Sequence, residues 1–315
     1  MLFRSPNANV VVVADPNADA AEAGRQLARA ERATTDPLDA IADPTVEAVI
    51  INTPTTTHAT YIEAALRAGK AVWTEKPIAQ ELADTKRIVE LWRGSGLPVQ
   101  VGFMRRFDPG YARAKAMIDA GELGRIEQFR ALSRDTNPPP LEFLLTCGGS
   151  FLDMSVHDLD LARFLVGEVE EVHAWANVLF DDRFAKADDW DTSVIMLKFR
   201  NGALGVVETA RHSNWGYDIR AEVAGAIGKV VVDGERMTPL THYRDVATES
   251  DLFPDFMDRF EVAYRRELEV FFADLGAGRP VGPGPDDAYE TLRLAVACTR
   301  SWREGRPVKL DEVVA

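Results

Sequence analysis

The sequence has few cysteines and no long apolar segment. Only Cys147 and Cys298 occur among 315 residues, without the paired spacing of a zinc site or a redox motif. Such sparse cysteine is typical of a cytoplasmic protein. No apolar run is long enough to cross a bilayer, and the first residues do not resemble a secretory leader. We therefore expect a soluble cytoplasmic protein that has no membrane partner.

Positive charge is also scarce. Lysine and arginine number 36 against 50 acidic residues, which gives a formal net charge of -14. Nucleic-acid binding requires a concentrated basic surface, so this composition argues against a nucleic-acid partner. The acidic runs at 181–182 and 188–191 lack the oxygen spacing and glycine of a calcium loop. We predict a solvated loop there and no metal site.

The rest of the composition is that of an ordinary globular protein, long enough for two domains with cores of their own. In the first hundred residues, apolar runs with strand character alternate with helical patterns. This alternation predicts an α/β domain with a parallel, doubly wound sheet over residues 1–102. The predicted strands are 10–14, 46–51, 71–74 and 99–103, and the predicted helices are 18–33, 57–68 and 82–95.

After residue 102 the pattern changes, because several predicted strands follow one another without intervening helices. Turns at 200–202 and 225–228 are typical of hairpins. We predict that residues 103–315 form an α+β domain with an open, mostly antiparallel sheet. Its predicted strands are 126–133, 172–179, 193–199, 203–209, 219–224 and 229–232, and its helices include 110–120, 256–277 and 286–304.

The stretch from residue 148 to residue 165 carries the strongest catalytic candidates. Two glycines precede Ser150, which is predicted to be the N-cap of a helix. Helical spacing places Asp153, His157 and Asp160 on one face that is apolar further along, so this face is expected to line a cleft. A carboxylate one turn from a histidine suits a general base. A surface pair or a core histidine satisfied by its neighbour are the structural alternatives.

Polar residues follow the predicted parallel strands where each ends. Asp15 follows the first, residues 52–54 follow the second, and Glu75 and Lys76 follow the third. Doubly wound sheets bind ligands beyond the carboxyl ends of their strands, so these residues are candidates for ligand binding. Taken alone, Asp15 before Pro16 is better explained as the start of a plain turn, and Lys76 beside Glu75 is equally typical of a surface pair.

Taken together, these stretches resemble the Gfo/Idh/MocA family of nicotinamide-dependent oxidoreductases, and within it the inositol 2-dehydrogenases. The resemblance rests on the order and separation of several motifs, each of them weak alone. They are Ala14-Asp15-Pro16, Asn52-Thr53-Pro54 with His58, Glu75-Lys76-Pro77, and residues 101–108, 149–160 and 216–220.

The resemblance implies roles for individual residues. Lys76 corresponds to the lysine that contacts the substrate hydroxyl and the cofactor, and Asp153 and His157 to the pair that transfers the proton. Asp15 corresponds to the acid that binds the adenosine ribose, which implies NAD. Other matched positions are Asn52, Thr53, Pro54, His58 and Glu75, with Lys76, for the cofactor, and Met104, Arg105, Asp135, Asn137 and Tyr217 for the substrate.

The predicted function is therefore NAD-dependent oxidation of a secondary ring hydroxyl of inositol, or of a related cyclic sugar or polyol, to a ketone by hydride transfer. We expect a homodimer or homotetramer that associates through the sheet of the second domain. The alternative is a non-catalytic sugar-binding or regulatory pseudoenzyme of the same fold that has lost dinucleotide binding.

The sequence departs from the family at its start, where a strand, a Gly-x-Gly-x-x-Gly turn and a helix are expected. The chain instead enters the pattern of the second strand almost at once. Three explanations are open: an N-terminally shortened enzyme, a pseudoenzyme whose sheet closes around the gap, or a strand supplied by another segment or subunit. We favour the first, because Lys76, Asp153, His157 and Asp15 are all present.

Overall fold

A computed structural model describes residues 8–315, and Met1 to Asn7 lie outside the described residues. The chain divides into two compact units. Residues up to 104 form the first together with 264–290 and 315, and residues 105–263 and 291–314 form the second. The predicted boundary after residue 102 would assign 264–290 to the second domain, whereas this segment belongs to the first unit.

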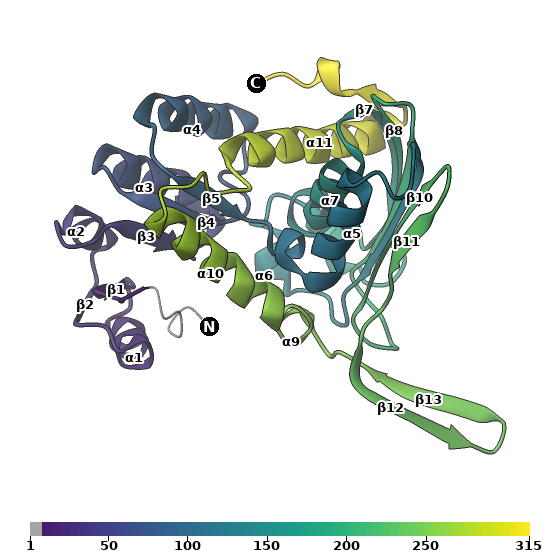
Figure 1. The fold of residues 1–315 in the computed structure, drawn as a ribbon, viewed down its shortest axis with the longest axis horizontal. Helices are drawn as coiled ribbons and strands as arrows, with labels where there is room; N and C mark the ends of the chain where they lie inside the picture. The colour runs from purple at the N-terminus through teal and green to yellow at the C-terminus, as the bar shows by residue number, and fades with distance from the viewer. Residues whose placement is uncertain (1–7) are drawn as a thin grey trace. The chain divides into compact units, whose positions relative to one another are not determined.

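In the first unit, short parallel strands alternate with helices, as predicted (Figure 1). Strands β4 and β5 are the most deeply buried, since the four residues of β4 before Glu75 and all four residues of β5 are buried. The elements are β1 Val12–Ala14, α1 Ala18–Ala28, β2 Arg32–Thr34, α2 Pro37–Ala42, β3 Ala48–Ile51, α3 Thr55–Arg67, β4 Ala71–Glu75, α4 Leu82–Ser95 and β5 Val99–Gly102.

The parallel strands of this unit form two separate sheets, β1-β2 and β3-β4-β5. The usual order of a doubly wound dinucleotide fold is 3-2-1-4-5-6. If β1 corresponds to strand 2 of that order and β3 to strand 4, the break between β1 and β3 lies where strand 1 would pair with both. The predicted incomplete Rossmann arrangement is thus confirmed for the described residues.

The predicted helix over residues 18–33 was too long. Helix α1 ends at Ala28, because Arg29 adopts left-handed backbone angles with φ 54° and closes the helix. The next residues form β2, and the N–H groups of Glu31 and Arg32 both donate to the carbonyl oxygen of Val11. Alanine-rich sequence continues the helical pattern beyond the point where pairing with β1 takes over.

Helix α10, Glu261–Gly276, explains why residues 264–290 join the first unit. Leu268 and Phe271 on this helix share a buried apolar cluster with Ala71 and Trp73 of β4. Burial of two large apolar side chains stabilises such a contact by a few kcal/mol. Apolar periodicity predicted the helix but could not indicate which sheet its face covers.

The second unit is built on a seven-stranded sheet with the order β11-β10-β6-β9-β8-β7-β14. All neighbouring strands are antiparallel except β6 and β9, so the prediction of an open, mostly antiparallel sheet is confirmed. Its strands are β6 Ile126–Arg134, β7 Val169–Asn177, β8 Thr192–Phe199, β9 Leu204–Ala210, β10 Asp218–Gly225, β11 Lys229–Val232 and β14 Val308–Lys309.

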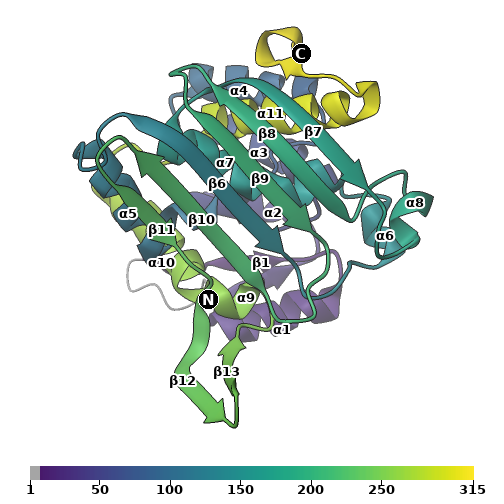
Figure 2. The same ribbon diagram turned by 90° about the vertical axis from the view of Figure 1, so that its right-hand side faces the viewer.

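Helices cover one face of this sheet, and Figure 2 looks onto the other face, which no helix of this unit crosses. Strand β8 alternates accordingly, with Ile195 and Leu197 buried and Val194 and Met196 exposed. The helices that lie wholly or mainly in this unit are α5 Pro109–Asp119, α6 Leu141–Leu144, α7 Val156–Val166, α8 Arg183–Lys186, α9 Phe256–Arg259 and α11 Pro285–Glu304.

A hairpin of β12, Arg236–Arg244, and β13, Ala247–Leu252, extends from this unit and was not predicted (Figure 1). Its strands show no alternation of buried and exposed residues, since every residue in them is at least partly exposed. The alternating pattern that identifies half-buried strands is therefore absent. Among residues 8–315, no helix is both long and apolar enough to span a membrane.

Candidate active site

The helix that carries Asp153 and His157 begins differently from the prediction. Gly148 and Gly149 have φ values of 85° and 94°, which glycine adopts without strain, and a π-helical turn over 151–155 leads into α7. Ser150 has helical backbone angles and does not cap the helix. Its N–H and its hydroxyl both donate to the Asp189 carboxylate, at 2.9 and 2.7 Å.

Burial along this segment singles out the two predicted proton-transfer residues. Between residues 151 and 160, only Asp153 and His157 keep partial exposure, and the other eight positions are buried. Asp160 was expected on the same face, but it is buried and accepts from Arg106 at 2.6 and 2.9 Å. The open face of this segment therefore presents one carboxylate and one imidazole.

Hydroxyl groups attach the start of this helix to the covered face of the sheet. Ser155 lies 3.3 Å from the Thr209 hydroxyl on β9, and Thr209 lies 2.7 Å from the Ser193 hydroxyl on β8. All three residues are buried. Because buried hydroxyls need partners, this chain of hydrogen bonds fixes how the helix start sits on the sheet.

Arg211, which the sequence analysis did not single out, lies between two predicted site residues. Its guanidinium donates to Asp153 at 2.7 Å, to Asp135 at 3.2 Å and to the Ser150 hydroxyl at 3.3 Å. Burial raises the pKa of Asp135 and the neighbouring Asp153 adds to this, while Arg211 opposes it. Burial also raises the pKa of the Cys147 thiol, with Asp153 contributing.

The predicted substrate-pocket residue Arg105 is buried in an ion pair. Its Nη1 donates to Asp158 at 2.7 Å and to the Ser133 hydroxyl at 3.2 Å, and both partners are fully buried. Burial opposes the charge of Arg105, but Asp158 nevertheless raises the pKa of the guanidinium. Burial raises the pKa of the Tyr217 phenol, which lies beside Arg105.

The other predicted substrate residues differ in exposure. Met104 is buried, and Asn137 is exposed and donates weakly to the Thr136 hydroxyl at 3.4 Å.

In the first unit, the predicted cofactor residues lie at the carboxyl ends of parallel strands. Asp15 follows β1 and accepts from the N–H of Asn17 at 2.8 Å. Thr53 follows β3 and accepts from the Thr57 hydroxyl at 2.7 Å. Asn52 and Pro54 on either side of Thr53 are exposed. This edge therefore carries a carboxylate, an amide and a hydroxyl.

His58 is held by backbone at both ring nitrogens. Nδ1 lies 2.7 Å from the carbonyl oxygen of Pro77, and Nε2 lies 2.7 Å from that of Thr53. A neutral imidazole donates only one hydrogen bond, whereas the imidazolium donates two. The side chain is buried and connects the segments that follow β3 and β4. We conclude that His58 braces these two segments.

Glu75 and Lys76 stand at the end of β4, and Lys76 precedes a cis peptide bond to Pro77. The Glu75 carboxylate accepts from the Lys76 N–H at 3.3 Å, and loss of hydration raises the pKa of Glu75. A Cβ added at Gly102 would come within 3.0 Å of this carboxylate, so glycine there makes room for it.

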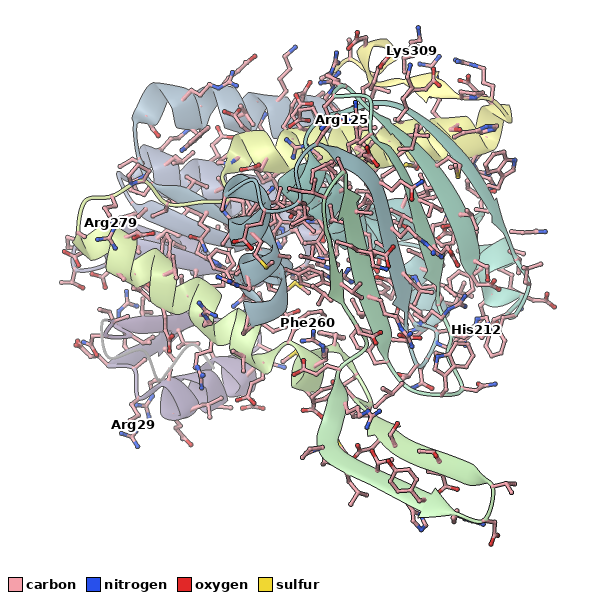
Figure 3. All side chains as sticks on the ribbon, turned by 45° about the vertical axis from the view of Figure 1, so that its right-hand side comes forward. Arg29, Arg125, His212, Phe260, Arg279 and Lys309 are labelled. Carbon is pink, nitrogen blue, oxygen red and sulfur yellow. The ribbon has the colours of Figure 1, made fainter. Side chains whose placement is uncertain are left out.

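The acidic loop predicted to be solvated is partly buried. The Asp191 carboxylate is inaccessible and accepts from the N–H groups of Leu179, Phe180 and Asp181. These hydrogen bonds fix the backbone of residues 179–181. The Phe180 ring stacks on His212, which Figure 3 labels, with the ring centroids 4.0 Å apart. In the described part of the chain, no three acidic, histidine or cysteine side chains are grouped as metal ligands.

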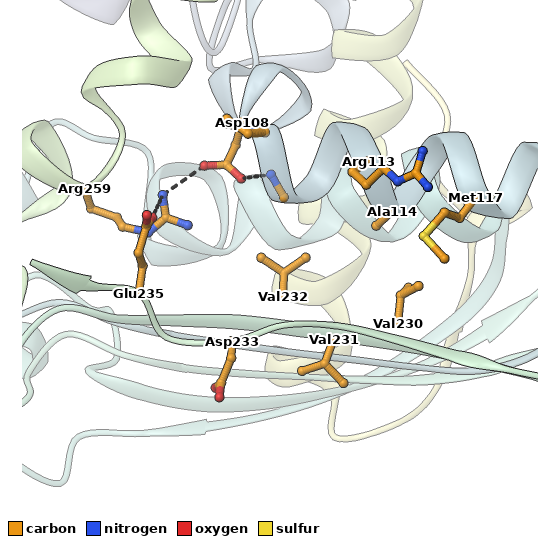
Figure 4. Close-up of a pocket in the computed structure, with 12 residues that line it drawn as sticks. Asp108, Arg113, Ala114, Met117, Val230, Val231, Val232, Asp233, Glu235 and Arg259 are labelled. Atoms are coloured by element: carbon orange, nitrogen blue, oxygen red, sulfur yellow. Dashed lines mark hydrogen bonds and ion pairs between the residues drawn. The ribbon is translucent and has the colours of Figure 1, made fainter. Parts of the chain in front are cut away.

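A separate cavity of about 460 Å³ lies in the second unit between α5 and β11 (Figure 4). Val230, Val232 and Met117 form its apolar wall, and Arg259 at one end binds Asp108. None of the predicted site residues lines this cavity.

Parallel strands that alternate with helices and end in polar residues are the arrangement of a dinucleotide-binding fold. The chain belongs to the Gfo/Idh/MocA oxidoreductase family. Residues 1–103 match the model of its NAD-binding Rossmann fold, and residues 115–310 match that of its C-terminal α/β domain. The predicted enzyme class and the predicted cofactor, NAD, are confirmed by this membership.

Similar proteins are named inositol dehydrogenases. The scyllo-inositol 2-dehydrogenase (NAD(+)) of Bacillus subtilis is 39% identical over 97% of this chain and 90% of its own length. The myo-inositol 2-dehydrogenase of Thermotoga maritima is 36% identical over 98% and 93%. A crystal structure of the Lactobacillus casei scyllo-inositol dehydrogenase with bound NAD(H) and scyllo-inositol is 25% identical, with a TM-score of 0.91 and coverage of 98% and 94%.

Proposed function

We propose that this enzyme oxidises a secondary ring hydroxyl of inositol, or of a related cyclic polyol, to the ketone. The observation that carries the proposal is the joint exposure of Asp153 and His157 on an otherwise buried helical segment. The substrate class is supported by relatives of similar length that are named inositol 2-dehydrogenases.

In the proposed reaction, the substrate loses a hydride from carbon and a proton from oxygen. NAD, when bound, supplies the acceptor for the hydride. His157 accepts the hydroxyl proton, and Asp153 polarises the imidazole and stabilises its charged form. Lys76 stabilises the negative charge that develops on the substrate oxygen. The product is a ketone, and the proton remains on His157 until solvent removes it.

The residues at the strand ends of the first unit fit the cofactor. The Asp15 carboxylate is an acceptor suited to a ribose diol, and Thr53 and Lys76 offer donors. We propose that Asn52, Pro54 and Glu75 complete this side, with His58 acting through the backbone segments that it braces. Asp135, Asn137 and Tyr217 are the proposed substrate contacts, together with Met104 and Arg105.

The first test is titration of the protein with NADH, followed by turnover on a panel of inositols and aldoses. We expect micromolar binding and NAD reduction with at least one inositol. Lys76→Ala and His157→Ala should lower kcat by at least about a hundredfold. Lys115→Ala, a lysine paired with Asp119 on helix α5, is the matched control and should leave turnover unchanged. Sugar binding without turnover would instead identify the non-catalytic alternative.

We also propose that the protein is a homodimer or homotetramer that associates through the uncovered sheet face shown in Figure 2. Trp175 on β7 lies opposite Val194 on β8, and Met196 follows two residues later on the same face. All three side chains are more than one-third exposed. Clustered exposed apolar residues are typical of interfaces.

Both cysteines are buried free thiols, which supports the expected cytoplasmic location.

A further inference from the structure

Arg211 is held at a fixed place by the only parallel strand pair of the described seven-stranded sheet. Strand β6 pairs with β9 in a register that sets Arg134 opposite Ala210, and Asp135 N–H continues this ladder by donating to the Ala210 carbonyl at 3.0 Å. The next residues, Asp135 and Arg211, therefore leave the same edge of the sheet side by side.

Every nitrogen of the guanidinium has a partner at this edge. Each of its three nitrogens donates to one partner: Nε to Ser150, Nη1 to Asp135 and Nη2 to Asp153. The Arg211 side chain is only 5% exposed, whereas the two carboxylates are 26% and 20% exposed. A buried arginine thus connects the strand ends to the helix segment that carries the proposed proton-transfer pair.

We propose that Arg211 is a positioning residue of the reaction, which holds Asp153 in the orientation that His157 requires and keeps Asp135 and Asp153 ionised together. This inference rests on the proposed function. Without the guanidinium, two carboxylates would face each other in a poorly hydrated site, and protonation of one of them would relieve the repulsion. A protonated Asp153 would no longer stabilise the charged imidazole of His157.

The other titratable groups near this cluster do not replace the arginine. Asp189 accepts from Ser150, and Cys147 is a neutral thiol whose pKa is raised by burial. Arg105 acts on Asp135 only weakly and is already paired with Asp158. Arg211 is therefore the cation that directly contacts both carboxylates.

The test is the pH profile of kcat/KM for Arg211→Met. We expect a loss on the order of a hundredfold at neutral pH. We also expect the acidic limb to move up by about one to three pH units, the range by which a neighbouring cation lowers the pKa of a carboxyl group. Adding Asp135→Asn to this variant removes the repulsion and should return the limb toward its original position.

Two variants separate charge from geometry and from general damage. Arg211→Lys keeps the charge but not the planar fork, so the acidic limb should stay in place while kcat falls. Arg200→Met removes an exposed arginine that pairs with Asp311 in the same unit. This variant should change neither kcat nor the position of the acidic limb. An acidic limb that is unmoved in Arg211→Met, or that does not return in the double variant, would overturn the proposal.

A second measurement does not depend on turnover. The thermal stability of Arg211→Met should fall further below that of the original protein at pH 8 than at pH 5.5, because the ionised carboxylates of Asp135 and Asp153 lose the guanidinium that contacts both of them. Asp135→Asn should remove this pH dependence. An equal loss at both pH values would overturn the proposal for Arg211. Absence of turnover in the original protein would overturn only the proposed function.

Discussion

Replacing Arg105 by methionine tests whether this residue is a substrate contact or a structural one. The guanidinium binds Asp158 and Ser133 inside the second unit and is 3% exposed, while the Asp158 side chain is inaccessible. Arg105→Met leaves the Asp158 charge buried without its partner. We therefore expect the main effect to be a loss of stability, with a smaller effect on substrate binding.

The magnitude follows from the burial of both charges. Removing one partner of a buried ion pair costs about 3–5 kcal/mol. In a unit of 150–250 residues, each kcal/mol corresponds to about 2–4 °C, which gives a decrease in Tm of about 6–20 °C. Adding Asp158→Asn removes the unpaired charge and keeps a partner for the Ser133 hydroxyl. The double variant should recover most of the loss.

The assay is thermal unfolding of both variants and of the original protein, together with KM for the best inositol. Nearly equal Tm for Arg105→Met and the original protein, with a strongly raised KM, would refute the structural interpretation. So would a double variant as unstable as Arg105→Met alone. Arg125→Met, an exposed arginine paired with Glu127 in the same unit, is the matched control and should shift Tm little.

Three further predictions follow from the same structure. His58→Phe removes the ring nitrogens that lie 2.7 Å from the carbonyl oxygens of Pro77 and Thr53. A buried carbonyl oxygen that accepts from the ring loses its donor, so we expect a loss of about 1–3 kcal/mol in denaturant unfolding together with weaker NADH binding; unchanged NADH affinity would contradict the brace. Burial raises the pKa of Glu75 above its ordinary 4.5. The stability that Glu75 contributes in its protonated form is therefore present at low pH and is lost as the pH rises through the pKa of the folded state. Glu75→Gln should therefore gain stability relative to the original protein between pH 5 and pH 8, about 1.4 kcal/mol for each tenfold difference in proton affinity, and a constant difference in urea unfolding would contradict this. Trp175→Glu with Met196→Glu should shift the sedimentation coefficient to that of a smaller species, and an unchanged oligomer would place the interface elsewhere.

The sequence predicted the helices and strands well where the spacing of apolar residues matches the spacing of buried side chains. Helix α4 has the predicted limits, and β8 differs from its prediction by a single residue, because each presents a regular apolar face to a core. The predictions were wrong where something other than local hydrophobic periodicity determines the secondary structure. Strand β2 is three residues long and depends on pairing with β1, and the hairpin of β12 and β13 has no buried face.

The site was predictable only in part for a related reason. Asp153 and His157 are four residues apart, so helical spacing alone puts them together. Asp160 has compatible spacing, but a long-range ion pair with Arg106 and burial remove it from the open face. Ser150 has the sequence of an N-cap, but its N–H and its hydroxyl both donate to the Asp189 carboxylate from a distant loop, and its side chain does not cap the helix. Local patterns contain no information about such partners.

Arg211 shows most clearly what the sequence could not reveal. It lies 58 residues from Asp153 and 76 from Asp135, and no spacing rule joins residues so far apart. Had β6 and β9 paired antiparallel, like the other neighbouring strands of this sheet, Asp135 and Arg211 would leave opposite edges. The one parallel pair brings both residues to the same edge, where the helix bearing Asp153 can meet them. The strand direction at this single step of the sheet thus determines whether Arg211 can reach the Asp153 carboxylate.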